Sequence, residues 1–301
     1  MPLITTRTSG GAFGLGWSAA TDEGSIIWDF SSYSGTATSN DGVATASPTG
    51  AVLQLHSGYG VDPTNTAWYW SNIKNNTTAS VITKGVNAHA SGSGYFGNLF
   101  WQIGGCYDIY HSFAENFVRS YNGASWSARS SMPNDTSRTT AACDNSVGLF
   151  VLPGSKYPTY EGFPADYINK FYKLTSVTGS WTALTNTPDT YRQSTYPAYT
   201  SGGYVTIVND WGLSSYLAYR YNVASNTWSA LSVAPVTGIG YVGIANGNKY
   251  WFADHANNRA YSIKETETTW SVGQVMTGTH GSPLVAIDNT VYSVQTGTKT
   301  P

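Results

Sequence analysis

The sequence predicts an all-β protein, a six-bladed β-propeller in which strands from the start of the chain close the last blade. Three observations support this. Short alternating or β-branched runs bounded by Gly, Asn, Asp and Ser recur along the 301 residues, whereas helical periodicity is nearly absent. A tryptophan recurs in one local context. An apolar strand recurs with a period near 48 residues, which is about the length of a four-stranded propeller blade.

Only residues 166–174 show any sign of helical periodicity. The alternation of Tyr167, Asn169 and Phe171 in this stretch favours a strand. We therefore expect no helix in the domain.

The tryptophan repeat has a constant shape: an aromatic-rich strand, a polar turn, the tryptophan, a small residue and a short polar run. Its four copies centre on Trp126, Trp181, Trp228 and Trp270, which are 42 to 55 residues apart. Such a recurrence indicates repeated structural units.

The apolar-strand repeat follows small residues and a Gly or Asn turn. It occurs six times, in Ala51–Leu55, Leu99–Ile103, Val147–Leu152, Tyr204–Val208, Lys249–Phe252 and Thr290–Val294. One such strand in each blade predicts six blades.

Closure of the ring is predicted because only five complete hairpins follow the six strands. Ile26–Ala37 has the layout of Leu217–Trp228, so we expect N-terminal strands to complete the blade begun by the last residues. This pairing would remove two exposed sheet edges. The predicted organisation is an N-terminal arm of residues 1–23 and a propeller of residues 24–301.

The repeats resemble those of the kelch-repeat β-propellers. Leu99–Gly105, followed by Tyr121, Trp126 and Met132-Pro133, is the most similar segment, and it alone keeps the paired glycines. The resemblance implies a propeller fold. It does not choose a function, because kelch propellers include adaptors, oxidases and carbohydrate binders.

A second resemblance lies in Thr6–Ala19, which is similar to the Gly-rich leader of many bacteriophage tail and virion proteins. Glycines at 10, 11, 14 and 16 carry a large backbone entropy and bury nothing, so the segment cannot fold alone. It can become ordered by docking on a neighbouring subunit, or it can be an ordinary disordered terminus. The same glycines interrupt any signal-peptide apolar region, which disfavours a secretory leader.

Composition excludes several classes of partner. The chain has 15 basic and 17 acidic residues and no basic cluster, which argues against a nucleic-acid partner. No apolar run approaches the length of a membrane-spanning helix.

The two cysteines, Cys106 and Cys143, lack metal-ligand spacing. We expect two buried thiols, with a single bridge between neighbouring strands as the alternative.

A binding site is predicted on the rim formed by the loops that leave the second strand of each blade. Residues 105–116 and 154–166 form long loops there, and aromatic rings beside polar groups suit sugar faces or flat protein surfaces. The candidate ligand-binding residues are Tyr107, Tyr110, Tyr157, Tyr160 and Trp211. The alternative is that these rings pack the loops against the blades.

We expect no enzyme, no cofactor and no metal. The five histidines, His56, His89, His111, His255 and His280, are scattered without ligand spacing. The rim carboxylates Asp108, Glu115, Glu161, Asp166, Asp210 and Asp254 are candidates for glycoside hydrolysis, which requires two carboxylates about 5 to 10 Å apart. Exposed acidic residues are usually solvated, so we expect them not to be catalytic.

Together these observations predict a non-enzymatic virion structural protein, in a phage tail or head appendage. Its arm would bind other virion proteins, and its loop face would meet a host-surface glycan or protein. A carbohydrate-active enzyme using the rim carboxylates and a secreted, extracellular lectin-like kelch domain are the alternatives.

Overall fold

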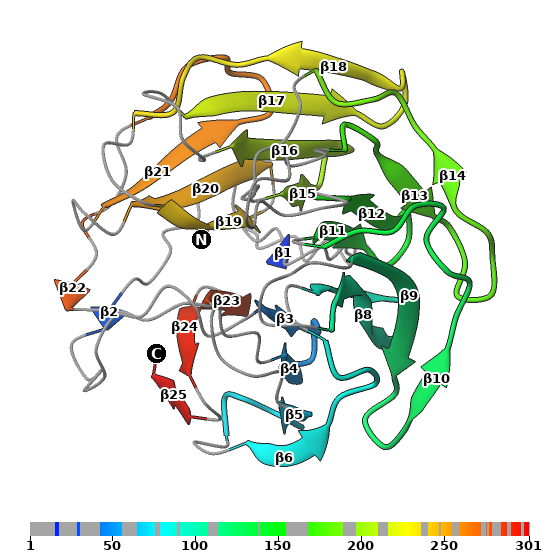
Figure 1. Cartoon of the computed structure of the whole chain (residues 1–301). Helices are drawn as coiled ribbons and strands as arrows, with labels where there is room; N and C mark the ends of the chain where they lie inside the picture. The colour runs from blue at the N-terminus through cyan, green and yellow to red at the C-terminus, as the bar shows by residue number, and fades with distance from the viewer. Residues whose placement is uncertain are drawn as a thin grey trace, which may run out of the picture.

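The structure is all-β, as predicted. The computed structural model of the chain describes residues 16–17, 29–30, 43–55, 65–75, 79–88, 91–107, 114–137, 139–154, 168–188, 197–209, 216–235, 240–246, 248–254, 259–271, 275, 277–278, 284–287, 290–295 and 298–300. Every regular element in these ranges is a β-strand (Figure 1). A helix long and apolar enough to span a membrane is not found within them.

Four sheets have the form of propeller blades, each with four antiparallel strands paired in sequence order. The first contains β3 (Val43–Ala46), β4 (Val52–Leu55), β5 (Thr66–Trp70) and β6 (Ser80–Thr83). The second contains β7 (Gly92–Phe96), β8 (Leu99–Cys106), β9 (Ala114–Tyr121) and β10 (Trp126–Ala128). The third contains β11 (Thr140–Asp144), β12 (Gly148–Leu152), β13 (Tyr172–Leu174) and β14 (Thr182–Ala183). The fourth contains β15 (Ala198–Thr200), β16 (Tyr204–Asn209), β17 (Leu217–Asn222) and β18 (Thr227–Ala230).

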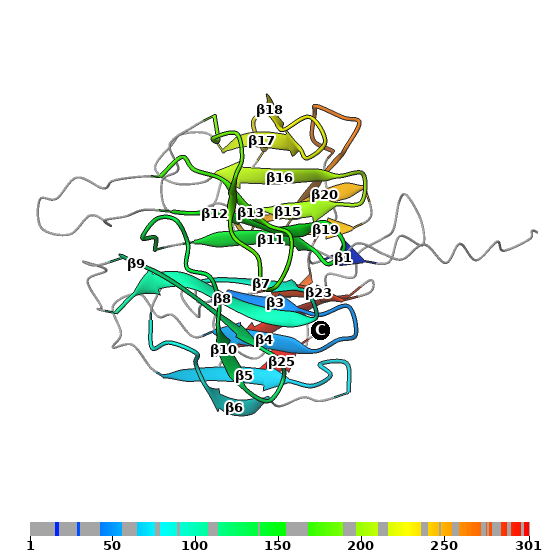
Figure 2. The ribbon, with the colours of Figure 1, turned by 90° about the vertical axis from the view of Figure 1, so that its right-hand side faces the viewer.

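Two further sheets follow along the chain. In one, β19 (Gly240–Asn246), β20 (Lys249–Asp254) and β21 (Arg259–Lys264) are antiparallel, and β1 (Gly16–Trp17) adds to β19 in parallel. The other contains β23 (Leu284–Ile287), β24 (Thr290–Gln295) and β25 (Thr298–Thr300). Two views at right angles place β18 and β6 at opposite edges of the molecule (Figures 1 and 2).

The N-terminal part of the predicted closure is only partly described. Within Ile26–Ala37, β2 (Asp29–Phe30) pairs in parallel with β22 (Thr277–Gly278). The rest of Ile26–Ala37 lies outside the described residues, so its pairing with the last strand stays a prediction. Of the predicted arm, only Gly16–Trp17 is described.

The core is divided among the joints between sheets. One apolar cluster spans the sheets β3–β6, β7–β10 and β11–β14, and another joins β11–β14 to β15–β18. A third joins β15–β18 to β19–β21, and a fourth joins β3–β6 to β23 and β24. The innermost strands β3, β7, β11, β15, β19 and β23 contact one another in that order, and β23 also contacts β3.

Strand register confirms the repeat phase that the apolar strands predict. In five sheets the reference residue of the apolar strand pairs with a residue of the third strand, which in turn pairs with a Ser or Thr that follows the third strand. The reference residues are Leu53, Trp101, Phe150, Thr206 and Trp251, and the corresponding Ser or Thr residues are Ser80, Ser127, Thr182, Ser229 and Ser271. The residue before each of the last four is the repeated tryptophan. Before Ser80 it is Ala79.

Each repeated tryptophan joins its sheet to the preceding one, through what we call the tryptophan latch. The indole Nε1 donates to a backbone carbonyl across the joint, from Trp126 to Thr83 (2.7 Å), Trp181 to Ser130 (2.9 Å), Trp228 to Thr185 (3.0 Å) and Trp270 to Ser232 (2.9 Å). Every acceptor stands four residues after the preceding repeat position, which is Ala79 or a tryptophan. The sequence repeat is therefore a repeated joint.

Both cysteines are buried, reduced thiols, as we expected, and they do not form a disulfide. Cys106 ends β8 and Cys143 lies in β11.

Candidate functional site

One of the five predicted rim residues lies in the described part of the chain. Tyr107 follows β8, is 49% exposed, and stacks on Phe117 of β9, with ring centroids 6.4 Å apart and planes at 29°. It thus packs on its own sheet while exposing half of its surface, which is compatible with either expected role. The other four, Tyr110, Tyr157, Tyr160 and Trp211, lie outside the described residues.

Of the candidate carboxylates, Glu115 and Asp254 lie in described strands, β9 and β20, and the other four do not. A cluster of three or more His, Cys, Asp or Glu able to hold a metal is not found among the described residues.

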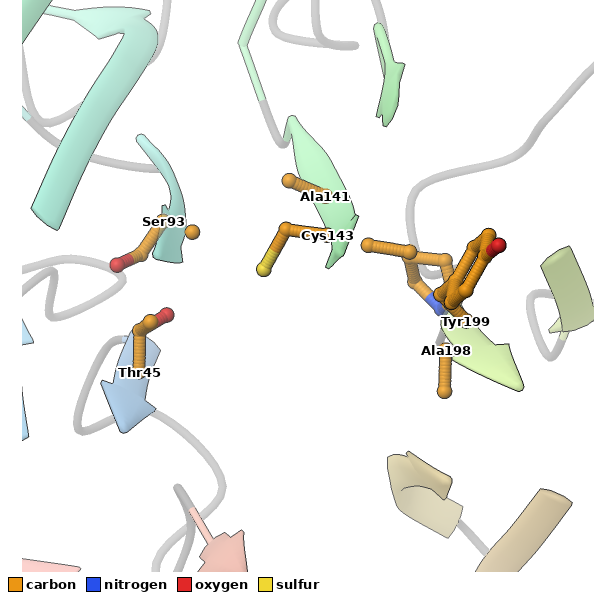
Figure 3. Close-up of a pocket in the computed structure, with 9 residues that line it drawn as sticks. Thr45, Ser93, Ala141, Cys143, Ala198 and Tyr199 are labelled. Carbon is orange, nitrogen blue, oxygen red and sulfur yellow. The ribbon is translucent and has the colours of Figure 1, made fainter. Parts of the chain in front are cut away.

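A small pocket lies where four innermost strands converge (Figure 3). Thr45 comes from β3, Ser93 from β7, Cys143 from β11 and Tyr199 from β15. The cavity volume open to the centre of a water molecule is about 10 Å³, close to the minimum that holds one water. The pocket therefore suits a structural water rather than a larger ligand.

The polar side chains that line this pocket include Ser93, Cys143 and Tyr199. The Ser93 hydroxyl is buried and has no hydrogen-bond partner among the described residues. The Sγ of Cys143 accepts a hydrogen bond from the Tyr95 amide at 3.3 Å. Burial, together with the negative charges of Asp144 and Glu265, raises the pKa of Tyr199 to about 12, so its hydroxyl stays protonated near neutral pH.

Small residues allow the inner strands to converge on this pocket. Gly94, Ala141, Ala142 and Ala198 line it. A Cβ on Gly94 would lie 2.7 Å from Leu149 Cδ1, so a side chain here would require the Leu149 side chain to shift. The small residues that precede each apolar strand are visible in the sequence, but their pattern alone did not predict this pocket.

Two cations, Lys84 and Arg220, are buried among the described residues, and the sequence patterns predicted neither. Lys84, 4% exposed, donates from Nζ to the Ala88 carbonyl at 3.1 Å, and burial lowers its pKa to about 8. It lies in the connection from β6 to β7. There Gln102 of β8 also donates to the Val86 carbonyl at 2.8 Å.

Arg220 of β17, 7% exposed, reaches the next sheet. Its guanidinium donates to the backbone carbonyls of Lys264 (2.6 Å), Glu265 (2.7 Å) and Glu267 (2.8 Å). Burial lowers its pKa, while Glu265, Tyr204 and Glu267 oppose that shift. Arg220 is therefore a structural clamp between β15–β18 and β19–β21.

No protein-family model and no curated protein matches this sequence. The repeated four-stranded sheets implied by the kelch resemblance are present, and no family is identified.

Proposed function

We propose that this chain is a non-enzymatic structural protein of a virus particle, part of a phage tail or head appendage. In this proposal its body is a six-bladed propeller that supports a binding face. The observation that carries the proposal is the uniform joint: four successive pairs of sheets are linked by the same tryptophan latch. Such a body is a rigid support for loops, which is what an assembly and attachment protein needs.

Loop placement supports the binding face. In the second, third and fourth sheets, the second and third strands pair in the same antiparallel order. The connections after β8, β12 and β16 therefore leave the body at equivalent ends, and the one after β12 is the longest of the three. The half-exposed Tyr107 stands at the start of the first of these connections.

Contacts between the innermost strands support a closed ring of six sheets. They run through all six inner strands and return from β23 to β3. In addition, Gln54 Nε2 donates to the Val294 carbonyl at 3.4 Å, across 240 residues of sequence. A ring with blades at such equivalent positions leaves few exposed edges.

Strand addition supports the arm. β1 and β2 both pair in parallel with strands from the C-terminal third of the chain, and β1 adds to the edge of a larger sheet through its backbone. Addition of an extended segment to a sheet edge is also a common way for one chain to bind another. We propose that the residues before Gly16 dock in this way on a neighbouring virion protein.

The test begins with mass spectrometry of particles purified from the native source, compared with the soluble fraction. The proposal expects the chain in the particles, and its absence from them would refute a virion role. Particles assembled with a chain lacking residues 1–15 should then lose the protein, while its circular dichroism and thermal midpoint stay unchanged. Undiminished incorporation of this truncated chain would refute the docking arm.

The loop face is tested with the full chain on a panel of surface glycans. Tyr107→Ala should weaken any binding detected at least about tenfold, because it removes an aromatic contact surface. Val81→Ala, an exposed apolar residue on the outer strand β6, is the matched control and should bind normally. Turnover of a polysaccharide, lost on changing Glu161 or Asp210 to the amide, would refute the non-enzymatic assignment.

A further inference from the structure

The pocket between the innermost strands contains a buried serine hydroxyl that calls for a bound molecule. Ser93 of β7 is 8% exposed and lines the pocket, and its Oγ has no hydrogen-bond partner among the described residues. A buried hydroxyl loses its hydration on folding, and native proteins restore the lost bond with another protein group or with an ordered water. The question is therefore what small molecule the pocket would bind beside Ser93.

Two further polar atoms face the same space. Thr45 of β3 and Cys143 of β11 line the pocket with Ser93. Figure 3 shows the Thr45 hydroxyl and the Cys143 sulfur directed toward the side where Ser93 lies, whereas the Tyr199 hydroxyl lies on the far side of its ring. A hydroxyl both donates and accepts, and a thiol sulfur is a weak acceptor. Two hydroxyls from different strands, with a sulfur beside them, thus surround one small space.

The size of the space limits the occupant. The volume open to the centre of a water molecule is about 10 Å³, which is close to the minimum for one water. The other lining side chains are small or apolar, and they belong to Gly94, Ala141, Ala142, Pro197 and Ala198. Cavities that stay dry are apolar, whereas a cavity with two to four polar partners holds water. The hydroxyls therefore favour a hydrated pocket.

We propose that one ordered water occupies this pocket and bonds to Ser93 Oγ and Thr45 Oγ1, beside the Cys143 sulfur. It links β7 to β3, the innermost strands of two neighbouring sheets, which also contact each other directly. A bridging water is enthalpically nearly as good as a direct hydrogen bond, so it adds a polar link to the apolar cluster between these sheets. The site does not depend on the biological role of the chain.

A high-resolution crystal structure of the unaltered full-length chain tests the proposal. We expect one electron-density peak in the pocket, at about 2.6 to 3.2 Å from both Ser93 Oγ and Thr45 Oγ1. An empty pocket, a peak beyond the reach of either hydroxyl, or density too large for a single water would overturn it.

Ser93→Ala removes the hydroxyl and adds no atom. The occupancy of the water should fall at least about fivefold, because one of the bonds that hold it is lost. Ser91→Ala is the matched control. Ser91 is 3% exposed, is not among the described residues that line the pocket, and accepts a hydrogen bond from Gln102 at 3.3 Å. The water should remain in this control, and undiminished occupancy in Ser93→Ala would overturn the proposal.

Nuclear magnetic resonance of the unaltered chain, labelled at its alanine methyl groups, provides a measurement that needs no variant. The methyl groups of Ala141 and Ala142, which line the pocket, should show cross-relaxation with a long-lived water. Ala67, which has no exposed surface and belongs to the apolar cluster of the first sheets, is the control and should show none. No signal at the pocket methyl groups, or an equal signal at Ala67, would overturn the proposal.

Discussion

The joint between β11–β14 and β15–β18 and the joint between β3–β6 and β23–β25 are alike in apolar burial, but at the position where the first has Trp228 the second has Ala79. Val205 and Ile207 in the first, and Val285 and Val294 in the second, expose no surface. Only the first carries the Trp228 latch and the bonds between Thr185 and Asn226. We therefore expect joints of the same architecture to differ in stability, because burial is non-directional, whereas an indole supplies a directional bond that alanine cannot make.

The largest effect is expected from Arg220→Ala, which would remove the clamp between β15–β18 and β19–β21. Three backbone carbonyls would lose a charged donor in a buried place, so we expect the free energy of unfolding to fall by about 4 kcal/mol. Urea unfolding at neutral pH measures this. Arg129→Ala, which removes one bond to the Ser120 hydroxyl, should lower it by only about 1 kcal/mol. Equal effects of the two variants would break the link between polar bonds and joint strength.

Lys84, in the connection between the first two sheets, should make stability depend on pH. Its pKa is about 8 when folded and 10.5 in a model peptide, so between these values the unfolded chain holds more protons. The free energy of unfolding should therefore rise with pH from about 8 to about 10, by up to about 3 kcal/mol. Above pH 10 the tyrosines with raised pKa values, such as Tyr221, oppose the rise.

Lys84→Met should abolish this rise and be more stable than the unaltered chain at pH 7, because the buried charge is removed. Urea unfolding of both proteins at several pH values gives the difference. An identical pH slope in the two proteins would show that Lys84 is not its source.

Gly85→Ala should weaken the latched joint between the first two sheets by about 2 kcal/mol. A Cβ at this position would lie 2.7 Å from the Trp126 ring and 2.9 Å from Arg119 Cβ, so the Trp126 ring would have to move from its position in the joint. The measurement is a double-mutant cycle with Trp126→Ala. The loss should be much smaller in that background, and full additivity would contradict the steric argument.

The smallest effect is expected from Trp181→Phe, which retains a ring but loses the indole bond to the Ser130 carbonyl. We expect a loss of about 1 kcal/mol in the free energy of unfolding. Thermal unfolding with Trp126→Phe alongside sharpens the comparison, since both latches should contribute similarly. A loss near zero for both would mean that ring packing, rather than the hydrogen bond, is the main contribution of the tryptophan latch.

Local pattern was enough to predict the strands and their repeat phase. Leu53, Trp101, Phe150, Thr206 and Trp251 proved equivalent in register because period-two alternation and turn residues act over a few neighbouring positions. The same patterns identified the four tryptophans as equivalent. Of the predicted rim residues, Tyr107 lies in the described part of the chain, and the rim site stays a prediction.

Tertiary structure alone decided what the repeats do to one another. Trp126 reaches a carbonyl 43 residues away, and Arg220 reaches one 45 residues away. Such distances along the chain carry no periodic signal, because contact across a joint depends on how two sheets pack. The equivalence of Ala79 to the tryptophans likewise became visible only through pairing with the neighbouring strand, since an alanine carries no motif of its own. Sequence determined the repeating unit, and packing in three dimensions determined how the units are joined.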